Sequence, residues 1–175
     1  MAGGGSPQWK DSMIIMGIDP GSNRCGYGIL EIEKNKILAA GSGIIRLEKK
    51  KILEDKLLHL NTSLNDLISE YKPDFAVVES IFYGKNIRTA FILGHVRGVI
   101  LFSLHQNDII IHSYSPREIK QSVTGKGSAT KNQVEYVVQS ILNLKTPAKD
   151  DAADGLACAI CLHNKIRFGE LRIKN

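Results

Sequence analysis

The chain has 175 residues, of which 43% are hydrophobic and 23% are charged, and its formal net charge is +5 at pH 7. This length suits a single domain that buries about 70% of the surface exposed by its unfolded chain. Three cysteines are too few, and odd in number, for a disulfide scaffold, which favours a reducing compartment. The apolar runs look too short or too interrupted to span a bilayer, so we expect a cytoplasmic protein without membrane contact.

The two ends of the chain differ in composition from the middle. Residues 1–12 are rich in glycine and serine, and the apolar pattern begins only at Met13. We therefore expect 1–12 to be an expression tag and linker, 13–164 to be the folded domain and 165–175 to be a basic C-terminal tail.

Hydrophobic periodicity along the chain alternates between the strand and helix periods. Three consecutive strands indicate an antiparallel meander, and the alternation that follows indicates a mixed sheet covered by helices. The pattern thus predicts an α/β three-layer domain. The predicted strands are 13–19, 26–33, 36–47, 75–79 and 108–112. The predicted helices are 57–71, 86–105, a short helix after Ser115, 129–142 and 151–164.

Capping residues mark the starts of two of these helices. Ser115 and Glu118 have the spacing of a capping box with proline at the first helical position, and Thr130 with Gln133 offers a second capping pair. The loop 125–128 between them resembles a phosphate-binding P-loop only superficially, because a glycine separates its lysine from its serine.

Two acidic residues end predicted apolar strands. Asp19 follows Ile14-Ile15-Met16-Gly17-Ile18, and Glu79 ends the run Phe75-Ala76-Val77-Val78. A helix cap explains neither position, and burying an unpaired charge is costly. Asp151 and Asp154 stand three residues apart in the first turn of the last helix, so they share a face. Each alone would be explained by the helix dipole, which is worth about 0.3 to 1 kcal/mol.

Taken together, these four carboxylates predict a metal site. Two divalent cations would neutralise the four negative charges, and ligation by oxygen alone favours Mg²⁺, with Mn²⁺ able to substitute, over zinc. Two such ions roughly 4 Å apart can activate water and stabilise the leaving oxygen of a phosphodiester. The leading hypothesis is therefore metal-dependent phosphodiester hydrolysis.

Positive charge is concentrated between Lys85 and Lys131, where seven basic residues stand against Asp108 and Glu118. A basic surface beside an acidic cluster suits a polyanionic substrate. Solvation of the surface remains the alternative explanation for any single lysine.

Other interpretations of individual motifs are weaker. Cys158, Cys161 and His163 suggest half a zinc site, but their surroundings of alanine and leucine favour one buried helix face. The segment 19–23 is similar to the phosphate loop of an actin-like ATPase or sugar kinase. That architecture needs a duplicated domain, for which a chain of this length has no room.

Several of these motifs, in this order, resemble the RuvC family of bacterial Holliday junction resolvases. The similarity extends from Met13 to about His163 and implies an RNase H-like fold with a mixed five-stranded sheet. It also implies a homodimeric endonuclease that makes symmetric paired nicks in four-way DNA junctions, leaving 5′-phosphate and 3′-hydroxyl ends, in recombination and DNA repair. The matching segments are Gly17-Ile18-Asp19-Pro20-Gly21-Ser22, Gly26-Tyr27-Gly28, Val77-Val78-Glu79 with Phe82, Lys85-Asn86 and Asp151-Ala152-Ala153-Asp154.

The resemblance also implies roles for individual residues. Asp19, Glu79, Asp151 and Asp154 match the metal-binding catalytic acids, although the separate duties of the last two stay open. Lys120 and Lys131 match basic residues near the bound strand, Phe82 matches an aromatic residue at the junction centre, and the branch-migration proteins RuvA and RuvB are implied partners. The full set of expected DNA contacts is Phe82, Tyr83, Lys85, Lys120, Lys126 and Lys131.

Two questions stay open at this point. The helix expected over 86–105, with Gly94 and Gly98 four residues apart, is the candidate dimer interface, and burial within the chain is the competing account. A module that binds junctions without cutting them is the alternative function, and the presence of all four acids argues against it.

Overall fold

The computed structural model describes residues 12–34, 36–81, 87–146 and 151–171. Within these residues, strands and helices follow one another in the predicted order. The strands are β1 (Ser12–Asp19), β2 (Arg24–Glu33), β3 (Lys36–Arg46), β4 (Phe75–Glu79) and β5 (Ile110–Tyr114). The helices are α1 (Leu53–Tyr71), α2 (Ile87–Gln106), α3 (Pro116–Thr124), α4 (Lys131–Leu142) and α5 (Asp151–Arg167).

The strands form one mixed sheet with the order β3-β2-β1-β4-β5. β1, β2 and β3 pair antiparallel, as the predicted meander requires, whereas β4 lies parallel to β1 and β5 lies parallel to β4. Ile18 of β1 is in register with Val78 of β4. The residues that follow them, Asp19 and Glu79, therefore lie at the same edge of the sheet.

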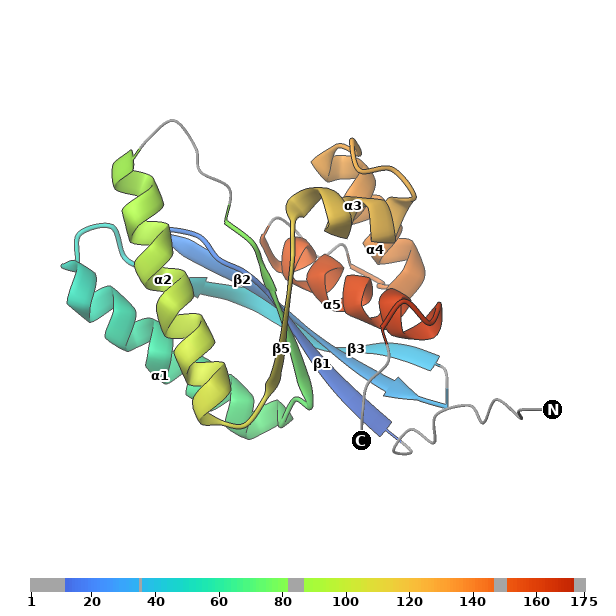
Figure 1. Ribbon diagram of the computed structural model, residues 1–175, viewed down its shortest axis with the longest axis horizontal. Helices are drawn as coiled ribbons and strands as arrows, with labels where there is room; N and C mark the ends of the chain where they lie inside the picture. The colour runs from blue at the N-terminus through green and yellow to red at the C-terminus, as the bar shows by residue number, and fades with distance from the viewer. Residues whose placement is uncertain (1–11, 35, 82–86, 147–150, 172–175) are drawn as a thin grey trace.

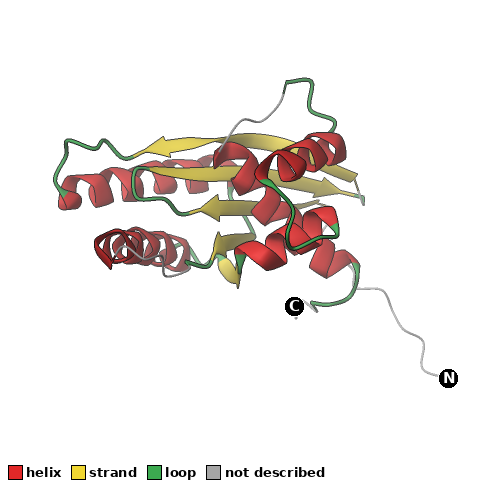
Figure 2. Cartoon of the chain, turned by 90° about the horizontal axis from the view of Figure 1, so that it is seen from above, coloured by secondary structure: helices red, strands yellow, loops and turns green. Residues whose placement is uncertain are grey.

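Helices cover both faces of the sheet, which confirms the predicted three layers. α1 and α2 lie on one face, and α3, α4 and α5 lie on the other (Figure 1). Seen from above, the strands form one twisted layer with helices along it (Figure 2). Each face has its own apolar cluster: Ile18, Leu64 and Ile100 belong to the first, and Ile15 and Leu156 to the second. Each of these side chains is at most 1% exposed.

α5 packs unusually close to the two strands beneath it, because glycines line the contact. A Cβ atom added at Gly26 would overlap the carbonyl group of Asp151, and one added at Gly28 would overlap the backbone of Leu156. A Cβ atom at Gly155 would overlap the backbone of Tyr27 in the same way. The first turn of α5 is therefore held directly against β2, close to the end of β1.

Both predicted capping boxes are present. The Ser115 hydroxyl accepts a hydrogen bond from the Glu118 backbone N–H at 3.2 Å, and the Glu118 carboxylate accepts one from the Ser115 N–H at 2.8 Å. Thr130 and Gln133 exchange the equivalent bonds at 3.3 and 2.9 Å. Because Thr130 is the cap, α4 begins at Lys131 rather than at the predicted residue 129.

Other boundaries differ by a few residues. The strand expected over 108–112 is instead β5, which begins at Ile110, because Asp108 has a positive φ of 57° and belongs to the turn after α2. α5 continues to Arg167, beyond the predicted end at residue 164, so the first residues assigned to the tail are helical. β1 begins at Ser12.

α2 exposes much of its apolar surface. Val96, Ile100 and Leu104 are buried against the sheet, but Phe91 and Phe102 are 67% and 63% exposed. α2 is long and apolar enough to cross a membrane, with a mean hydropathy of 1.5, whereas we expected from the sequence that the apolar runs would be too short or too interrupted. A single helix of this kind is weak evidence for a membrane, and an apolar face that is left exposed also marks a protein interface.

Candidate active site

Three of the four predicted acids converge closely. Asp19 ends β1, and Asp151 and Asp154 lie in the first turn of α5, which the glycine contacts hold against β2. One carboxylate oxygen from each of the three residues lies within 4.8 Å of the others. Glu79, at the end of the neighbouring strand, lines the same cleft as Asp19 and Asp154.

This cleft has a volume of about 240 Å³ and an acidic floor beside basic side chains. Lys120 of α3 and Lys131 of α4 line it together with Asp19, Glu79 and Asp154. Both lysines were predicted from the sequence to lie near a bound strand, and the structure brings both to the acidic cluster.

The carboxyl groups perturb one another. The pKa of Asp19 is raised from 3.8 to about 7, first by burial and then by the negative charges of Asp154 and Asp151. The pKa of Glu79 is raised from 4.5 to about 8, first by burial and then by the charges of Asp19 and Asp154. Two carboxyl groups therefore retain protons near neutral pH in the absence of a cation, which is the behaviour of ligands gathered for a positive ion.

Two basic side chains partly offset this negative charge. Lys131 Nζ lies 3.1 Å from Asp154 Oδ2 and 3.9 Å from Asp151 Oδ1. Arg24 Nε lies 3.1 Å from Asp151 Oδ2. Sequence reasoning missed Arg24, because a single arginine at the start of a strand has no pattern that separates it from ordinary surface charge.

The donor set fits a hard divalent cation. All the converging atoms are carboxylate oxygens, which is the ligand type preferred by Mg²⁺ and Mn²⁺. Asp151 Oδ2 is buried and accepts no hydrogen bond from the described residues, so its contact with Arg24 is an ion pair without an aligned N–H donor. Such an oxygen retains lone pairs for a metal ion.

The other predicted DNA contacts lie apart from this cluster or outside the described residues. Lys126 is exposed in the loop between α3 and α4, beside a separate groove that includes Tyr136. Phe82, Tyr83 and Lys85 belong to the segment between β4 and α2 and lie outside the described residues.

The predicted burial of the Cys158 and His163 region is confirmed. Cys158 and Cys161 are fully buried within α5, and His163 is 6% exposed. Burial raises the pKa of Cys161 to about 11, and that of Cys158 rises as well, so both thiols stay protonated and are poor zinc ligands.

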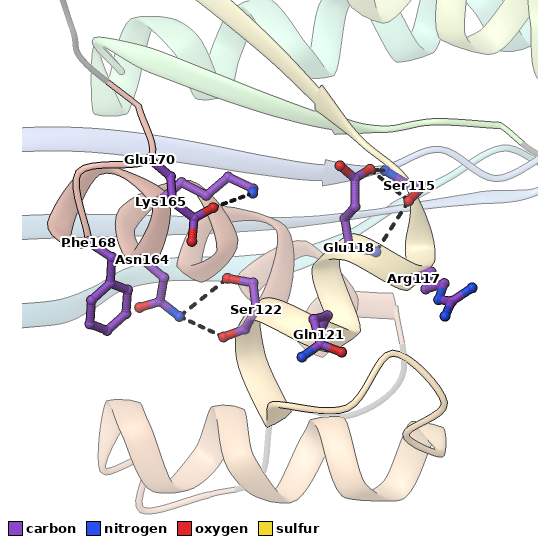
Figure 3. Close-up of a pocket in the computed structure, with 9 residues that line it drawn as sticks. All are labelled: Ser115, Arg117, Glu118, Gln121, Ser122, Asn164, Lys165, Phe168 and Glu170. Atoms are coloured by element: carbon purple, nitrogen blue, oxygen red, sulfur yellow. Dashed lines mark hydrogen bonds and ion pairs between the residues drawn. The ribbon is translucent and has the colours of Figure 1, made fainter.

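A second pocket, of about 540 Å³, lies between α3 and the C-terminal end of α5 (Figure 3). None of the four acids lines it. Lys165 pairs with Glu170 at 2.9 Å, and Asn164 donates a hydrogen bond to the Ser122 carbonyl oxygen at 2.9 Å. These four lining residues are therefore already paired with one another.

A mixed sheet of this order, covered by helices on both faces, has the RNase H-like fold. Its carboxylates, at the neighbouring ends of two parallel strands and on a helix packed against them, form the kind of site that metal-dependent nucleases use. Residues 15–163 match the family described as crossover junction endodeoxyribonuclease RuvC. The chain therefore belongs to the RuvC family.

Individual relatives agree with this assignment. The crossover junction endodeoxyribonuclease RuvC of Ruminiclostridium cellulolyticum is 44% identical over 91% of this chain and 96% of its own length. That of Petrotoga mobilis is 45% identical over 87% of this chain and 94% of its own. The structure of Thermus thermophilus RuvC superposes with a TM-score of 0.81 at 24% identity, covering 90% of this chain and 97% of that one, which confirms the fold.

Proposed function

We propose that this chain is a Holliday junction resolvase, which nicks two symmetry-related strands of a four-way DNA junction with the help of Mg²⁺. The observation that carries the proposal is the convergence of Asp19, Asp151 and Asp154 beside Glu79 in a cleft bordered by lysines. Its support from the family is the 44% identity to a crossover junction endodeoxyribonuclease. In addition, Thermus thermophilus RuvC has been solved in complex with a Holliday junction substrate.

The four acids would hold the divalent cations, and Asp19 and Asp154 belong both to the carboxylate cluster and to the lining of the cleft. Glu79 joins them from the cleft side, and Asp151 joins them from the side of β2. When bound, two Mg²⁺ ions supply an activated water and stabilise the leaving 3′ oxygen, which leaves 5′-phosphate and 3′-hydroxyl ends. Mn²⁺ has the same preference for oxygen ligands and should substitute.

The lysines would bind the backbone of the substrate. Lys120 and Lys131 line the cleft, so a phosphate that enters it meets two positive charges beside the acids. Lys126, exposed in the loop between α3 and α4, would contact a phosphate further along a strand. In the segment between β4 and α2, Phe82 or Tyr83 would stack on an unpaired base for about 1 to 3 kcal/mol, with Lys85 on a nearby phosphate.

A homodimer supplies the second active site. On α2, Ile87 and Phe91 are 72% and 67% exposed, and among the described residues no other part of the fold comes within 4 Å of a Cβ atom added at Gly94 or Gly98. This surface borders a groove of about 1070 Å³. A second copy of α2 would pack against this groove and form a two-fold dimer. Such a dimer has two active sites, one for each of the two symmetry-related strands of the junction.

The remaining assignments follow from the family. Residues 13–164 would form the resolvase domain, with 1–12 as an expression tag and linker and 165–175 as a basic tail, although β1 begins at Ser12 and α5 extends to Arg167. The family match over 15–163 supports the domain boundaries. RuvA and RuvB would act with this protein on junctions in the bacterial cytoplasm.

Replacing Asp19 with asparagine tests the catalytic role. The Asp19→Asn variant should bind a synthetic four-way junction as the unaltered protein does, whereas cleavage in Mg²⁺ should fall by at least about a hundredfold because a metal ligand is lost. Asp66→Asn, at an exposed position of α1, is the matched control and should cleave normally. Undiminished cleavage by Asp19→Asn would exclude this active site.

A further inference from the structure

Arg24 lies against the acidic cluster but belongs to none of the groups that line the cleft. We propose that Arg24 is a positioning residue that sets the cation affinity of the Asp151 side of the active site, by competing with a metal ion for that carboxylate. The inference rests on the proposed function, since it requires that the acids bind divalent cations.

The backbone holds the two partners together. Arg24 begins β2, and two residues later Gly26 packs against the carbonyl group of Asp151 with no room for a side chain. The backbone contact therefore brings the Arg24 guanidinium close to the Asp151 carboxylate, and Arg24 Nε lies 3.1 Å from Asp151 Oδ2. Asp151 is 17% exposed and Arg24 is 50% exposed, so the arginine covers the outer side of a mostly buried acid.

Asp151 divides its two oxygens between two basic residues. Oδ2 faces Arg24, and Oδ1 lies 3.9 Å from Lys131. Asp154 faces Lys131 at 3.1 Å and lines the cleft with Asp19, whereas Asp151 does not line it. Arg24 thus acts on the one acid that lies outside the cleft, whereas Lys131 lies closest to Asp154 inside it.

Charge balance gives the direction of the effect. Four ionised carboxylates against three basic side chains, Arg24, Lys120 and Lys131, leave a formal excess of one negative charge, which the first divalent cation already exceeds. A second cation therefore meets a positively charged cluster with a guanidinium at its edge, and the positive charge of Arg24 opposes its binding. Because Arg24 is half exposed and screened by solvent, its removal should tighten the weaker cation site by about three- to tenfold rather than by orders of magnitude.

The chain offers a matched control across the sheet. Arg46 of β3 is the direct register partner of Arg24, and it too is exposed. Arg46→Gln removes the same charge from a neighbouring position, without removing a partner of the aspartates.

The test is direct measurement of Mn²⁺ binding to the metal-free protein by electron paramagnetic resonance, at one alkaline pH and without DNA. Arg24→Gln should lower the dissociation constant of the weaker Mn²⁺ site by about three- to tenfold and leave the stronger site within about twofold. Arg24→Lys, which keeps the charge, and Arg46→Gln should both match the unaltered protein. The Mg²⁺ concentration for half-maximal junction cleavage should fall in parallel for Arg24→Gln alone.

Other results would overturn the inference. Unchanged or weaker Mn²⁺ binding by Arg24→Gln would show that the arginine does not compete with the ion. Weaker junction binding by Arg24→Gln in chelator, with Mn²⁺ affinity unchanged, would make Arg24 a phosphate contact instead. In both cases junction cleavage by the unaltered protein would leave the proposed function standing, whereas the absence of both Mn²⁺ binding and cleavage would remove that function itself.

Discussion

Asp19 and Glu79 end two neighbouring parallel strands, where apolar residues surround each carboxylate and other carboxylates face it. Neither position favours a negative charge in the folded chain. Nearby lysines offset part of the energetic cost, and bound cations would offset the rest, so stability and metal binding should depend on each other.

The coupling predicts how stability depends on pH in chelator. The pKa values of Asp19 and Glu79, about 7 and about 8, lie above the ordinary 3.8 and 4.5. The folded chain therefore binds more protons than the unfolded chain in this window, and the free energy of unfolding should fall as pH rises from about 4.5 to about 8. Mg²⁺ should raise the melting temperature more at about pH 8.5 than at about pH 5.5, as circular dichroism can measure.

A double variant separates the effect of Asp19 and Glu79 on the pH dependence of stability from the effect of the buried histidines. Burial lowers the pKa of His112 and His163, which makes stability rise with pH near the ordinary histidine value of 6.5. The double variant Asp19→Asn, Glu79→Gln keeps both histidines and should lose the decline in stability. An equally steep decline in the double variant would show that the two acids do not cause it.

The residue scale also shows where sequence reasoning succeeded and where it stopped. Asp19 and Glu79 could be found because a charge at the end of an apolar strand needs an explanation that local structure does not supply. Arg24 could not be found, since its importance comes from its ion pair with Asp151, which is distant in the sequence. The predicted roles of the acids and lysines stay predictions until variants are measured.

At the scale of elements, α5 is the part of the fold that builds the site. It is buried along most of its length, and glycines at Gly17, Gly26 and Gly28 let it approach the strands closely. The sequence predicted the helix itself from its alanine-rich composition and from Pro147 and Asp150 before it, but the close contact depends on which strand lies beneath each turn. The predicted start of β5 was wrong for a different, local reason: Asp108 adopts a left-handed backbone conformation, which lengthens the turn before the strand.

Gly26→Ala tests this packing. The added methyl group would overlap the backbone of Asp151, and backbone cannot move away without shifting the first turn of α5. We expect the free energy of unfolding to fall by about 1 to 3 kcal/mol, as for other overpacked sites, and Mn²⁺ affinity to fall with it. Urea denaturation and Mn²⁺ titration measure the two effects.

Gly125→Ala is a useful comparison for that variant. Gly125 has a positive φ of 77°, so alanine there is strained, but apart from its chain neighbours no described residue lies within 4 Å of its Cβ position. It should lose stability while Mn²⁺ affinity stays unchanged. If Gly26→Ala also kept its Mn²⁺ affinity, the packing of α5 would not position the acids.

At the scale of the whole molecule, the two faces of the sheet have different tasks. The α3, α4 and α5 face carries the acids of α5 and the lysines, and the α1 and α2 face leaves an apolar surface exposed. The sequence indicated α2 as the interface candidate from its two glycines. The sequence alone could not distinguish a dimer interface from burial within the chain, since both require an apolar helix.

Phe91→Asp tests the assembly. A charge placed on the exposed face of α2 should convert a dimer into a monomer in sedimentation experiments, because the side chain would be buried between two copies. Phe168→Asp, at a 69% exposed position beyond α5, should leave the dimer intact. A Phe91→Asp protein that remained dimeric would place the interface elsewhere.

The central claim is that these acids cut four-way junctions with the help of metal ions. The most direct measurement incubates the protein with a synthetic four-way junction or with a linear duplex of matched sequence, in Mg²⁺ or in chelator. The account predicts paired, symmetric nicks with ligatable 5′-phosphate ends in the junction, in Mg²⁺ only, and little cleavage of the duplex. Equal cleavage of the two substrates, or junction cleavage that persists in chelator, would contradict it.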